Sequence, residues 1–438
     1  MSAAHVHDVA GVGIGPFNLG LACLTEPLEE LDCVFLEREA QFAWHPGMLL
    51  ETSTLQVPFL ADLVSLADPT SPFSFLNWLK ETGTLYGFYI RERFQPLRTE
   101  YDDYCRWAAG RLRSLRFGRE VVAVEHDARE DAHVVRAVDR ATGADEVLRA
   151  RTLVLGVGTV PHVPPGCDGL DEEVAVHTAG YLPARDRLAA QRSVVLVGGG
   201  QSAAEVFLDL LGRMDDEQEL VWLTRSPRFF PLEYTKLTLE LTSPEYARYV
   251  HALPEAVRDG VVAQQAPLYK GIDAALIDEV FDELHRRRVQ GRRVPLLLTG
   301  TALEAARRDA YGRVALDLLH GETGERIGLE ADALVLATGY RYDVPAFLEP
   351  IRDRIAWDGR GRYAVREDYT VQAEGPRVFV QNAELHTHGF VAPDLGMGAH
   401  RNSTIIRALL GREVYPVEER IAMQRFGAPQ RPLAEAIG

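Results

Sequence analysis

One pattern occurs twice in this chain: an apolar strand, a glycine-rich turn and an apolar-periodic helix. The first copy, "DVAGVGIGPFNLGLACL", has a strand over residues 9–12 that runs into Gly11, Gly13, Gly15 and Pro16. Glycine lets the backbone approach a pyrophosphate closely, and the start of the following helix offers free N–H groups and partial positive charge. Proline suits the first turn of a helix. This copy predicts a dinucleotide-binding fold.

The second copy reads "RSVVLVGGGQSAAEVFLDLL", with a strand over residues 194–197 followed by Gly198, Gly200 and Ala203. Two dinucleotide folds in one chain are typical of flavoproteins that hold FAD on the first fold and NADPH on the second. The fold class predicted is therefore α/β, with two Rossmann-like domains.

The strands that follow the two glycine turns end differently. The strand "DCVFLE" ends in Glu37, and an acid there accepts hydrogen bonds from a ribose hydroxyl. The strand "ELVWLTR" ends in Arg225, and Arg228 follows in "SPRFF". Arginines pair with a 2′-phosphate that a carboxylate would repel, so the second site is predicted to prefer NADPH over NADH.

Two further buried strands mark where the chain crosses between the domains. They are "RTLVLGVGTVPHVP" (151–164) and "DALVLATGY" (332–340), and Thr338 and Gly339 of the second are expected at a cofactor. We predict an FAD domain made of residues 1–165 and 333–438, with the NADPH domain, 166–332, inserted in it. A mostly helical segment at about 230–290 is predicted to cap the substrate site.

Composition argues against several classes of protein. The net charge of −17 and the pI near 5.3 argue against nucleic-acid binding. No stretch approaches about 18 uninterrupted apolar residues, so no membrane span is expected, and the cytoplasm is the default location. The cysteines have neither CxxC nor metal-ligand spacing; they are Cys23, Cys33, Cys105 and Cys167.

The missing CxxC also excludes the disulfide reductases of this architecture, and the FxGxxxHxxx-W/P pattern of Baeyer–Villiger and flavin-containing monooxygenases is not found. Instead, four segments surround the glycine motifs: "FAWHPGMLL", "LQVPFLADLVSLADPTSPFSFLNWL", "LRTEYDDYCRWAA" and "LHTHGFVAPDLGMGAHRNS". In this order they resemble the N-hydroxylating monooxygenases of siderophore synthesis, which act on lysine, ornithine or diamines. The resemblance covers nearly the whole chain.

The resemblance implies an enzyme that uses NADPH and releasable FAD. Such an enzyme hydroxylates a terminal primary amine with dioxygen through a flavin C4a-hydroperoxide, and commonly assembles as a homotetramer. It also implies roles for individual residues. Gln56 would lie against the flavin, although a core glutamine bonded to backbone is the plainer alternative. The other implied flavin-side and nucleotide-side residues are Trp44, His45, Arg98, Gln201 and Ser202, with Gln56, Arg98 and Gln201 nearest the chemistry.

Ala61 is the informative departure from the family pattern. Lysine and ornithine hydroxylases typically have a lysine there, five residues after the glutamine, which pairs with the α-carboxylate of the substrate. The asparagine-bearing segment of ornithine enzymes is replaced by "LYKGI", which contains Leu268 and Lys270. A buried carboxylate without a partner is strongly disfavoured. A diamine such as putrescine or cadaverine is therefore the simpler substrate.

The far ammonium of a diamine needs an acid. Glu233 in "PLEYTK" and Asp394 in "APDLGMG" are the candidates, although either could be an exposed loop charge or a helix cap. Phe59, Leu60 and Leu395 would favour a neutral reacting amine by desolvation. Lys270 could instead replace the lost cation, which keeps an L-lysine N6-hydroxylase as the alternative. A non-catalytic NADPH-sensing protein is the alternative from another class.

The two histidines of "HTHG", His386 and His388, raise the question of a metal site. Two histidines with one residue between them can bind one ion from a strand, but no third ligand with fitting spacing is evident. Relatives carry this segment at the flavin and substrate without a metal. No metal is expected.

Overall fold

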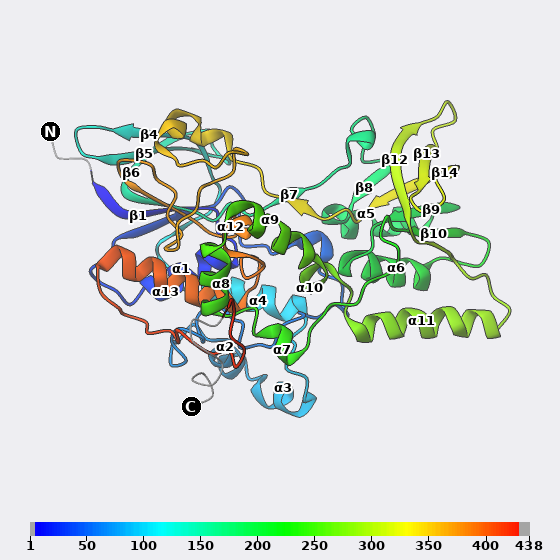
Figure 1. Ribbon diagram of the computed structural model, residues 1–438, viewed down its shortest axis with the longest axis horizontal. Coiled ribbons are helices and arrows are strands. Elements are labelled where there is room, and N and C mark those ends of the chain that lie inside the picture. The colour runs from blue at the N-terminus through cyan, green and yellow to red at the C-terminus, as the bar shows by residue number, and fades with distance from the viewer. Residues whose placement is uncertain (1–4, 429–438) are drawn as a thin grey trace.

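Two sheets organise the molecule, one in each of two α/β lobes that lie side by side in Figure 1. The computed structural model describes residues 5–428. The first sheet has the order β3–β2–β1–β6–β5–β4, and β17 also pairs with β6. β1, β2, β6 and β17 are parallel, whereas β4, β5 and β6 pair antiparallel. Its strands are β1 Val6–Val12, β2 Cys33–Leu36, β3 Leu115–Arg116, β4 Arg119–Asp127, β5 Ala132–Asp139, β6 Asp145–Leu155 and β17 Arg377–Val380.

Both faces of the first sheet are buried, which explains the near-continuous apolar runs of its parallel strands. One face packs against α1 (Pro16–Thr25), α4 (Arg98–Ala109) and α13 (Gly396–Leu410). On the other face, η4 (Ala346–Arg354) packs against β4. The first glycine turn therefore lies at one end of a tightly packed sheet, just before α1.

The second sheet has the order β11–β10–β9–β15–β8, and every strand pair in it is parallel. The antiparallel strands β12, β13 and β14 form a separate sheet in the same lobe. Each lobe thus has the α/β organisation that the glycine motifs predict. The elements of this lobe are β8 Ala175–His177, β9 Ser193–Val197, β10 Glu219–Leu223, β11 Leu296–Leu298, β12 Thr301–Arg308, β13 Val314–His320, β14 Arg326–Ala331, β15 Ala333–Leu336, α5 Tyr181–Ala189 and α6 Gln201–Arg213.

The chain crosses between the lobes through an antiparallel ribbon made of β7 (Val160–Pro161) and β16 (Tyr340–Arg341). Both strands lie in the segments where the sequence predicts a crossing. The domain boundary predicted between residues 332 and 333, however, comes one strand too early. β15 pairs with β8 and β9 in the second sheet, so the chain leaves this lobe only after residue 336. A buried apolar run identifies a strand but not the sheet that it joins.

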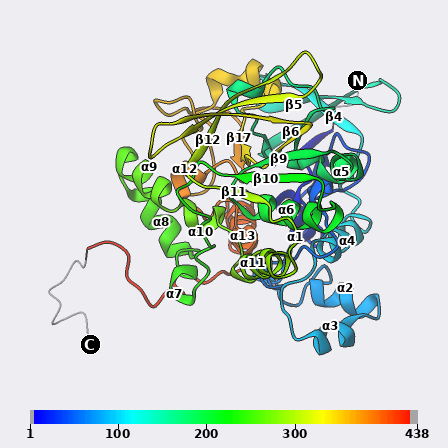
Figure 2. The same cartoon turned by 90° about the vertical axis from the view of Figure 1, so that its right-hand side faces the viewer.

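Four short helices follow β10 and form the expected helical insert. They are α7 (Lys236–Leu239), α8 (Pro244–Ala252), α9 (Glu255–Gln264) and α10 (Ala266–Lys270). Figure 2 shows them grouped on one side of the molecule. α8 and α9 contact α12 (Leu385–His388) of the first lobe, so the insert extends from the second lobe onto the first.

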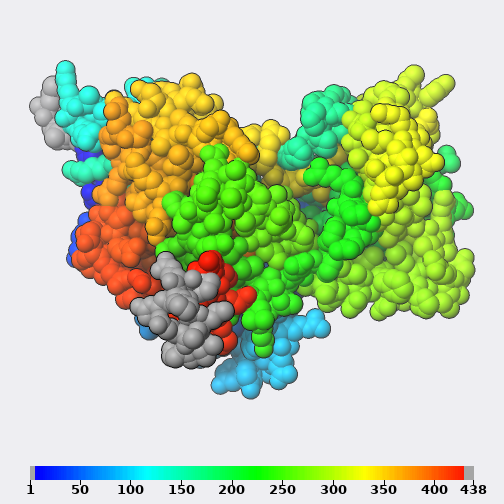
Figure 3. Space-filling model, viewed as in Figure 1, coloured from blue at the N-terminus to red at the C-terminus, as the bar shows by residue number. Residues whose placement is uncertain are grey.

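The segment after α13 packs along this insert (Figure 3). The backbone N–H groups of residues 421–424 donate hydrogen bonds to the carboxylates of Glu240 and Glu245. Phe426 packs edge-on against Tyr246, with the ring centroids 4.7 Å apart. Hydrogen bonds to charged groups are the stronger kind, so this segment is firmly attached to α7 and α8.

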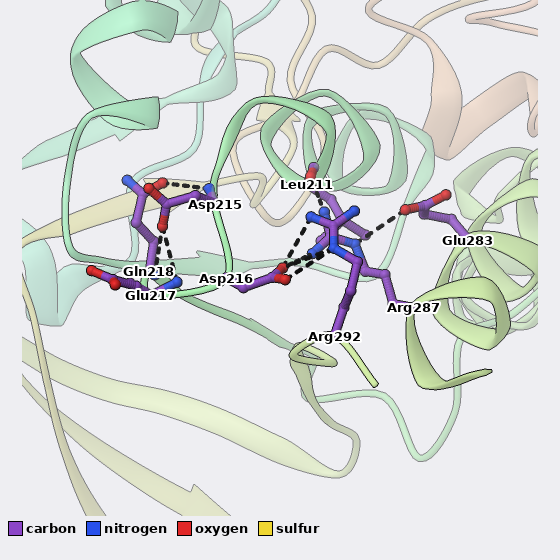
Figure 4. A network of polar contacts seen from close by, with 8 residues as sticks. All are labelled: Leu211, Asp215, Asp216, Glu217, Gln218, Glu283, Arg287 and Arg292. Carbon is purple, nitrogen blue, oxygen red and sulfur yellow. Dashed lines mark hydrogen bonds and ion pairs between the residues drawn. The ribbon is translucent and has the colours of Figure 1, made fainter. Parts of the chain in front are cut away.

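The helix α11 (Ala274–Val289) belongs to the second lobe, so the insert ends before the predicted residue 290. The buried Arg287 of this helix donates to the Leu211 carbonyl at 2.6 Å, to Asp216 at 3.2 Å and to Glu283 at 3.1 Å (Figure 4). The guanidinium of Arg287 is buried, although Asp216 is 42% exposed, so the bond to the Leu211 carbonyl is the one shielded from water. The network therefore fixes α11 against the end of α6.

The remaining helices are α2 (Phe75–Glu81), α3 (Leu85–Arg91), η1 (Pro46–Met48), η2 (Pro165–Cys167) and η3 (Thr178–Gly180). No helix within residues 5–428 is long and apolar enough to cross a membrane. All four cysteines are free thiols.

Candidate functional site

The first glycine turn contains contacts that a larger residue would obstruct. Gly13 has a φ of +86°, and a Cβ added there would lie 2.5 Å from the carbonyl oxygen of Gly156. A Cβ at Gly11 would lie 2.1 Å from an aromatic ring of β2. At Gly15, by contrast, an added Cβ would meet nothing within 4 Å, directly before Pro16 begins α1. The turn therefore leaves room for a phosphate at the positive end of α1, which fits the pyrophosphate of FAD.

Polar side chains hold this turn in place. Glu37, directly after β2, accepts a hydrogen bond from the Ile14 N–H at 2.8 Å. Asn18 donates to the Gly13 carbonyl at 2.7 Å, and its own side-chain oxygen accepts from Gln381 at 2.7 Å. The acid predicted from the sequence thus lies beside the turn. Asn18 and Gln381 escaped prediction, although an amide in so apolar a helix was a usable signal.

The second glycine turn has the same construction. Gly198 has a φ of +145°, and an added Cβ would lie 2.2 Å from the carbonyl oxygen of Ala337. Gly200 precedes the first residue of α6, and Ser202 lies in the first turn of that helix. Ala203 is fully buried in the core of the lobe. A small residue there lets α6 approach the sheet closely, as a dinucleotide site requires.

Thr338 and Gly339 lie in the crossing between the lobes. The Thr338 hydroxyl donates to the His162 carbonyl at 2.5 Å, and the His162 N–H donates to the Gly339 carbonyl at 2.9 Å. They follow Ala337, the residue that contacts the second glycine turn. Both predicted residues therefore lie beside a nucleotide turn and also close the ribbon.

Trp44 and His45 face the gap between the lobes. Trp44 packs edge-on against Tyr101 at 5.0 Å, and His45 packs against Tyr340 of the ribbon at 5.5 Å. His45 has the left-handed backbone conformation, with a φ of 49°. The surrounding protein atoms and the positive charge of Arg98 lower the pKa of His45, which favours the neutral imidazole.

A buried ion pair joins the two lobes. Arg98, the first residue of α4, donates two parallel hydrogen bonds of 2.8 Å to the Glu205 carboxylate in α6. Their side chains are 11% and 5% exposed. Gln201 donates to the same carboxylate at 2.8 Å and accepts from the Asp273 N–H at 2.8 Å.

This network brings together Arg98 and Gln201, two of the residues predicted nearest the chemistry, and adds Glu205, which was not predicted. Burial raises the pKa of Glu205, while the Arg98 charge opposes that rise. An acid on the otherwise apolar face of "SAAEVFLDLL" was the signal that could have identified it.

Gln56 lies next to this pair along the chain. Residues 53–55 run antiparallel to residues 96–98, with Thr54 opposite Leu97 and the Arg98 N–H bonded to the Ser53 carbonyl at 2.9 Å. The half-buried Gln56 side chain donates to the Thr54 carbonyl at 2.9 Å. Its side-chain oxygen has no hydrogen-bond partner within residues 5–428. The backbone bond agrees with the plainer alternative, and a cofactor contact through the free oxygen stays a prediction.

Ala61 and Asp394 both lie close to Gly396, at the start of α13. A Cβ added at Gly396 would lie 3.0 Å from Oδ1 of Asp394 and 3.8 Å from Cβ of Ala61. Ala61 is 6% exposed. The Asp394 carboxylate accepts from the N–H groups of Gly396 at 2.8 Å and Met397 at 3.3 Å, so it also caps the helix. Burial raises its pKa. A carboxylate thus lies beside the position where lysine and ornithine enzymes typically carry an ammonium.

The other predicted substrate residues surround this point less closely. Burial and the charge of Asp394 raise the pKa of Tyr234. The loop before α7, which contains Tyr234, therefore lies near the Asp394 carboxylate. Glu233 is exposed, with no ion pair in the part of the chain described. Leu395 packs on the core of the first lobe, and Leu268 packs in an aromatic cluster with Tyr246 and Phe390.

The predicted cations Arg225, Arg228 and Lys270 form no ion pair with a described residue. A Cβ added at Gly200 would be 3.2 Å from the Lys270 carbonyl oxygen, so the main chain of Lys270 lies beside the second glycine turn. The Lys270 ammonium lies 5.5 Å from the centroid of the Tyr269 ring, and Arg228 lies 4.4 Å from the ring of Phe230. The NADPH role of the two arginines and the substrate role of Lys270 stay predictions.

The histidines considered as metal ligands have protein partners. His386 lies 2.8 Å from the Tyr363 carbonyl, and His388 stacks on Tyr369. Within residues 5–428, one group could hold an ion by its geometry: His5, His7 and Asp32. It lies at the opposite end of β1, and both imidazoles already bond to one Asp32 oxygen.

Comparisons with known proteins agree with this geometry. The model of the L-lysine 6-monooxygenase/L-ornithine 5-monooxygenase family matches residues 5–342. The putrescine N-hydroxylase of Shewanella oneidensis is 47% identical over 423 residues, which cover 96% of this chain and 84% of that protein.

Solved structures extend the likeness to the whole fold. FAD-bound DfoA, a cadaverine monooxygenase of desferrioxamine biosynthesis from Erwinia amylovora, superposes with a TM-score of 0.94 at 48% identity, covering 98% of this chain and 100% of DfoA. The Kutzneria ornithine N-hydroxylase with reduced FAD, NADP⁺ and L-ornithine has a TM-score of 0.86 at 28% identity, covering 93% and 99%.

Replacing Arg98 with methionine should leave Glu205 buried without a partner and lower the free energy of unfolding by about 3–5 kcal/mol. The pKa of Glu205 then rises further, so the native protein keeps a proton that the unfolded chain releases. The loss should therefore grow as the pH rises above the pKa of the carboxyl group in the unfolded chain, as measured by urea unfolding of the FAD-loaded protein. The exposed Arg136–Glu125 pair gives the control: Arg136→Met should cost far less, because water screens the charges of an exposed pair. Equal losses for the two variants would contradict the role of the buried pair.

Proposed function

The chain belongs to the L-lysine 6-monooxygenase/L-ornithine 5-monooxygenase family, and we propose that it hydroxylates one amine of an aliphatic diamine, putrescine or cadaverine, for a hydroxamate siderophore. It is a flavin-dependent N-hydroxylating monooxygenase that uses FAD and NADPH. This membership removes the case for a non-catalytic NADPH sensor.

The observation that carries the diamine proposal is that Ala61 and the Asp394 carboxylate both lie within 4 Å of the position of a Cβ at Gly396. A methyl group occupies the position of the family's lysine, and a partly buried carboxylate lies beside it. An amino-acid substrate would bring its carboxylate next to a like charge in a low-dielectric site. The second ammonium of a diamine would instead find an opposite charge there.

The remaining residues act by position and by excluding water. The bound cofactors supply the hydride from NADPH and, with dioxygen, an electrophilic oxygen at the flavin. Asp394 holds the far ammonium, while Phe59 and Leu395, which pack on the core of the first lobe, desolvate the near amine. Leu60 is 46% exposed and does not fit the role predicted for it. Desolvation lowers the pKa of an amine from its usual value of about 10, so the nitrogen keeps the lone pair that attacks the oxygen.

The alternative substrate, L-lysine, requires a cation for its carboxylate. Lys270 is the candidate, and its ammonium lies 5.5 Å from the centroid of the Tyr269 ring. The similarity to a putrescine hydroxylase and a cadaverine monooxygenase also supports the diamine.

The test is hydroxylamine formed from putrescine, cadaverine, L-lysine and L-ornithine, each with FAD, NADPH and dioxygen. We expect kcat/KM for the better diamine to exceed that for either amino acid by about a hundredfold or more, because an unpaired buried carboxylate costs about 3 kcal/mol or more. A higher kcat/KM for L-lysine would replace the diamine proposal with the lysine one. NADPH oxidation without hydroxylamine from any amine would contradict both.

We also propose that the protein works as a cytoplasmic homotetramer, in keeping with its four free thiols. α3 projects from the body (Figures 1 and 3) and, with Phe94 three residues after its end, exposes large apolar side chains. Tyr86, Tyr89, Ile90 and Phe94 are 77%, 73%, 73% and 60% exposed. Such a patch on one helix is typical of a subunit contact.

Light scattering after size exclusion tests the assembly. We expect about four times the 48.7 kDa chain mass for the native protein and a smaller assembly for Ile90→Asp. Glu92→Gln, on the same projection, is the matched control and should keep the native mass. A monomeric native protein would contradict the proposal.

A further inference from the structure

Two histidines at the beginning of β1 have the same spacing as the pair in "HTHG", but here a third ligand is present. In "HVHD", His5 directly precedes β1 and His7 lies within it, and alternate residues of an extended chain point to the same side. Nε2 of His5 lies 2.6 Å and Nδ1 of His7 lies 2.8 Å from Oδ2 of Asp32. The three ligand atoms lie within 4.8 Å of one another, so two imidazoles and a carboxylate converge on one point.

The sheet fixes the segments that carry these ligands. Asp32 directly precedes β2, and its carbonyl accepts hydrogen bonds from the N–H groups of Asp8 at 2.9 Å and Val9 at 3.2 Å. The Asp32 N–H donates to the Asp8 carboxylate at 3.0 Å. On the other side of the strand, His7 pairs with Ala150 of β6. Main-chain bonds therefore hold residues 7 and 32 side by side.

The ligand types suit a transition metal ion. In a tetrahedral zinc site the metal lies about 2.0–2.2 Å from its nitrogen and oxygen ligands, so neighbouring ligand atoms are about 3.3 Å apart. Each imidazole nitrogen needs to move away from the Asp32 oxygen by less than about 1 Å to reach that spacing. A neutral imidazole binds a metal through one ring nitrogen and carries its proton on the other. Mg²⁺ and Ca²⁺ prefer oxygen ligands, whereas imidazole suits Zn²⁺ and the metals next to it.

The cluster is open to water on one side. The side chains of His5 and Asp32 are 71% and 45% exposed, whereas that of His7 is 11% exposed. A cavity of about 300 Å³ also borders His7 and Asp32. The other charged residues that line the cavity are Glu26, Arg113 and Arg116. An ion held by three protein ligands here keeps an open position for water, which a closed four-ligand site lacks.

We propose that His5, His7 and Asp32 bind a divalent transition metal ion, for which Zn²⁺ is the probe, and that the ion ties the residue before β1 to the beginning of β2. The site is separate from the flavin. His7 precedes Gly13 of the first glycine turn by six residues of nearly extended chain, a distance of about 20 Å. Metal binding therefore stabilises the far edge of the nucleotide fold and takes no part in the hydroxylation.

Isothermal titration of zinc chloride into the FAD-loaded protein, without an added histidine tag, tests the site. We expect one equivalent to bind per chain. His5→Ala and Asp32→Asn should each raise the Kd about tenfold or more, since even the outer partners of metal ligands contribute that much. His126→Ala is the matched control and should leave the Kd unchanged: His126 lies 3.1 Å from Asp131, and no third ligand joins that pair within residues 5–428.

Thermal unfolding gives a second measurement. Zn²⁺ should raise the Tm of the native protein and leave that of His5→Ala nearly unchanged, because an ion bound by the native state stabilises it. The absence of saturable zinc binding would overturn the proposal, as would an equal Kd for the native protein and His5→Ala. Equally tight binding of Mg²⁺ would also overturn it, since it would show a general attraction of this acidic protein for cations. Hydroxylamine formation from diamines is measured without added metal, so the metal site and the proposed function can fail separately.

Discussion

A single buried ion pair, Arg98 with Glu205, sets the relation between the two lobes on which the rest of the site depends. Each glycine turn can hold its nucleotide within its own lobe, but hydride transfer needs the two nucleotides face to face. The pair lies between the lobes, with Gln201 bonded to the same carboxylate and His45 close to the guanidinium. Because two charges removed from water are favourable only as partners, separation of the lobes is costly.

Charge is distributed across the site according to what each part must bind. Glu37 bonds to the first glycine turn, which is the FAD side, and the ribose of FAD carries no 2′-phosphate. Arg225 and the main chain of Lys270 lie on the side of the second turn. At the start of α13 the sign reverses, since Asp394 lies beside Ala61. We therefore propose that the cations serve NADPH and that the Asp394 carboxylate serves an amine.

Local features of the fold could be predicted from the sequence, and relations between distant segments could not. Both turns follow from their glycines because backbone sterics act over a few residues. The sheet joined by β15 depends on pairing with β8 and β9, about 140 to 160 residues earlier, which no local pattern records. Glu205 was missed for the same reason: its partner lies 107 residues away. The fold of residues 270–273 also brings the main chain of Lys270 beside the second glycine turn, which its place in a motif does not record.

The direct test of the diamine site is to reverse its charge with Ala61→Lys and Asp394→Asn together. The second change is needed because a lysine at 61 would otherwise pair with Asp394. The kcat/KM for L-lysine relative to cadaverine should rise about a hundredfold or more over the native enzyme, with the NADP⁺ Kd unchanged. If the double variant binds FAD and NADP⁺ normally yet keeps the native preference for cadaverine, Ala61 and Asp394 do not contact the substrate head group and the diamine assignment loses its physical basis.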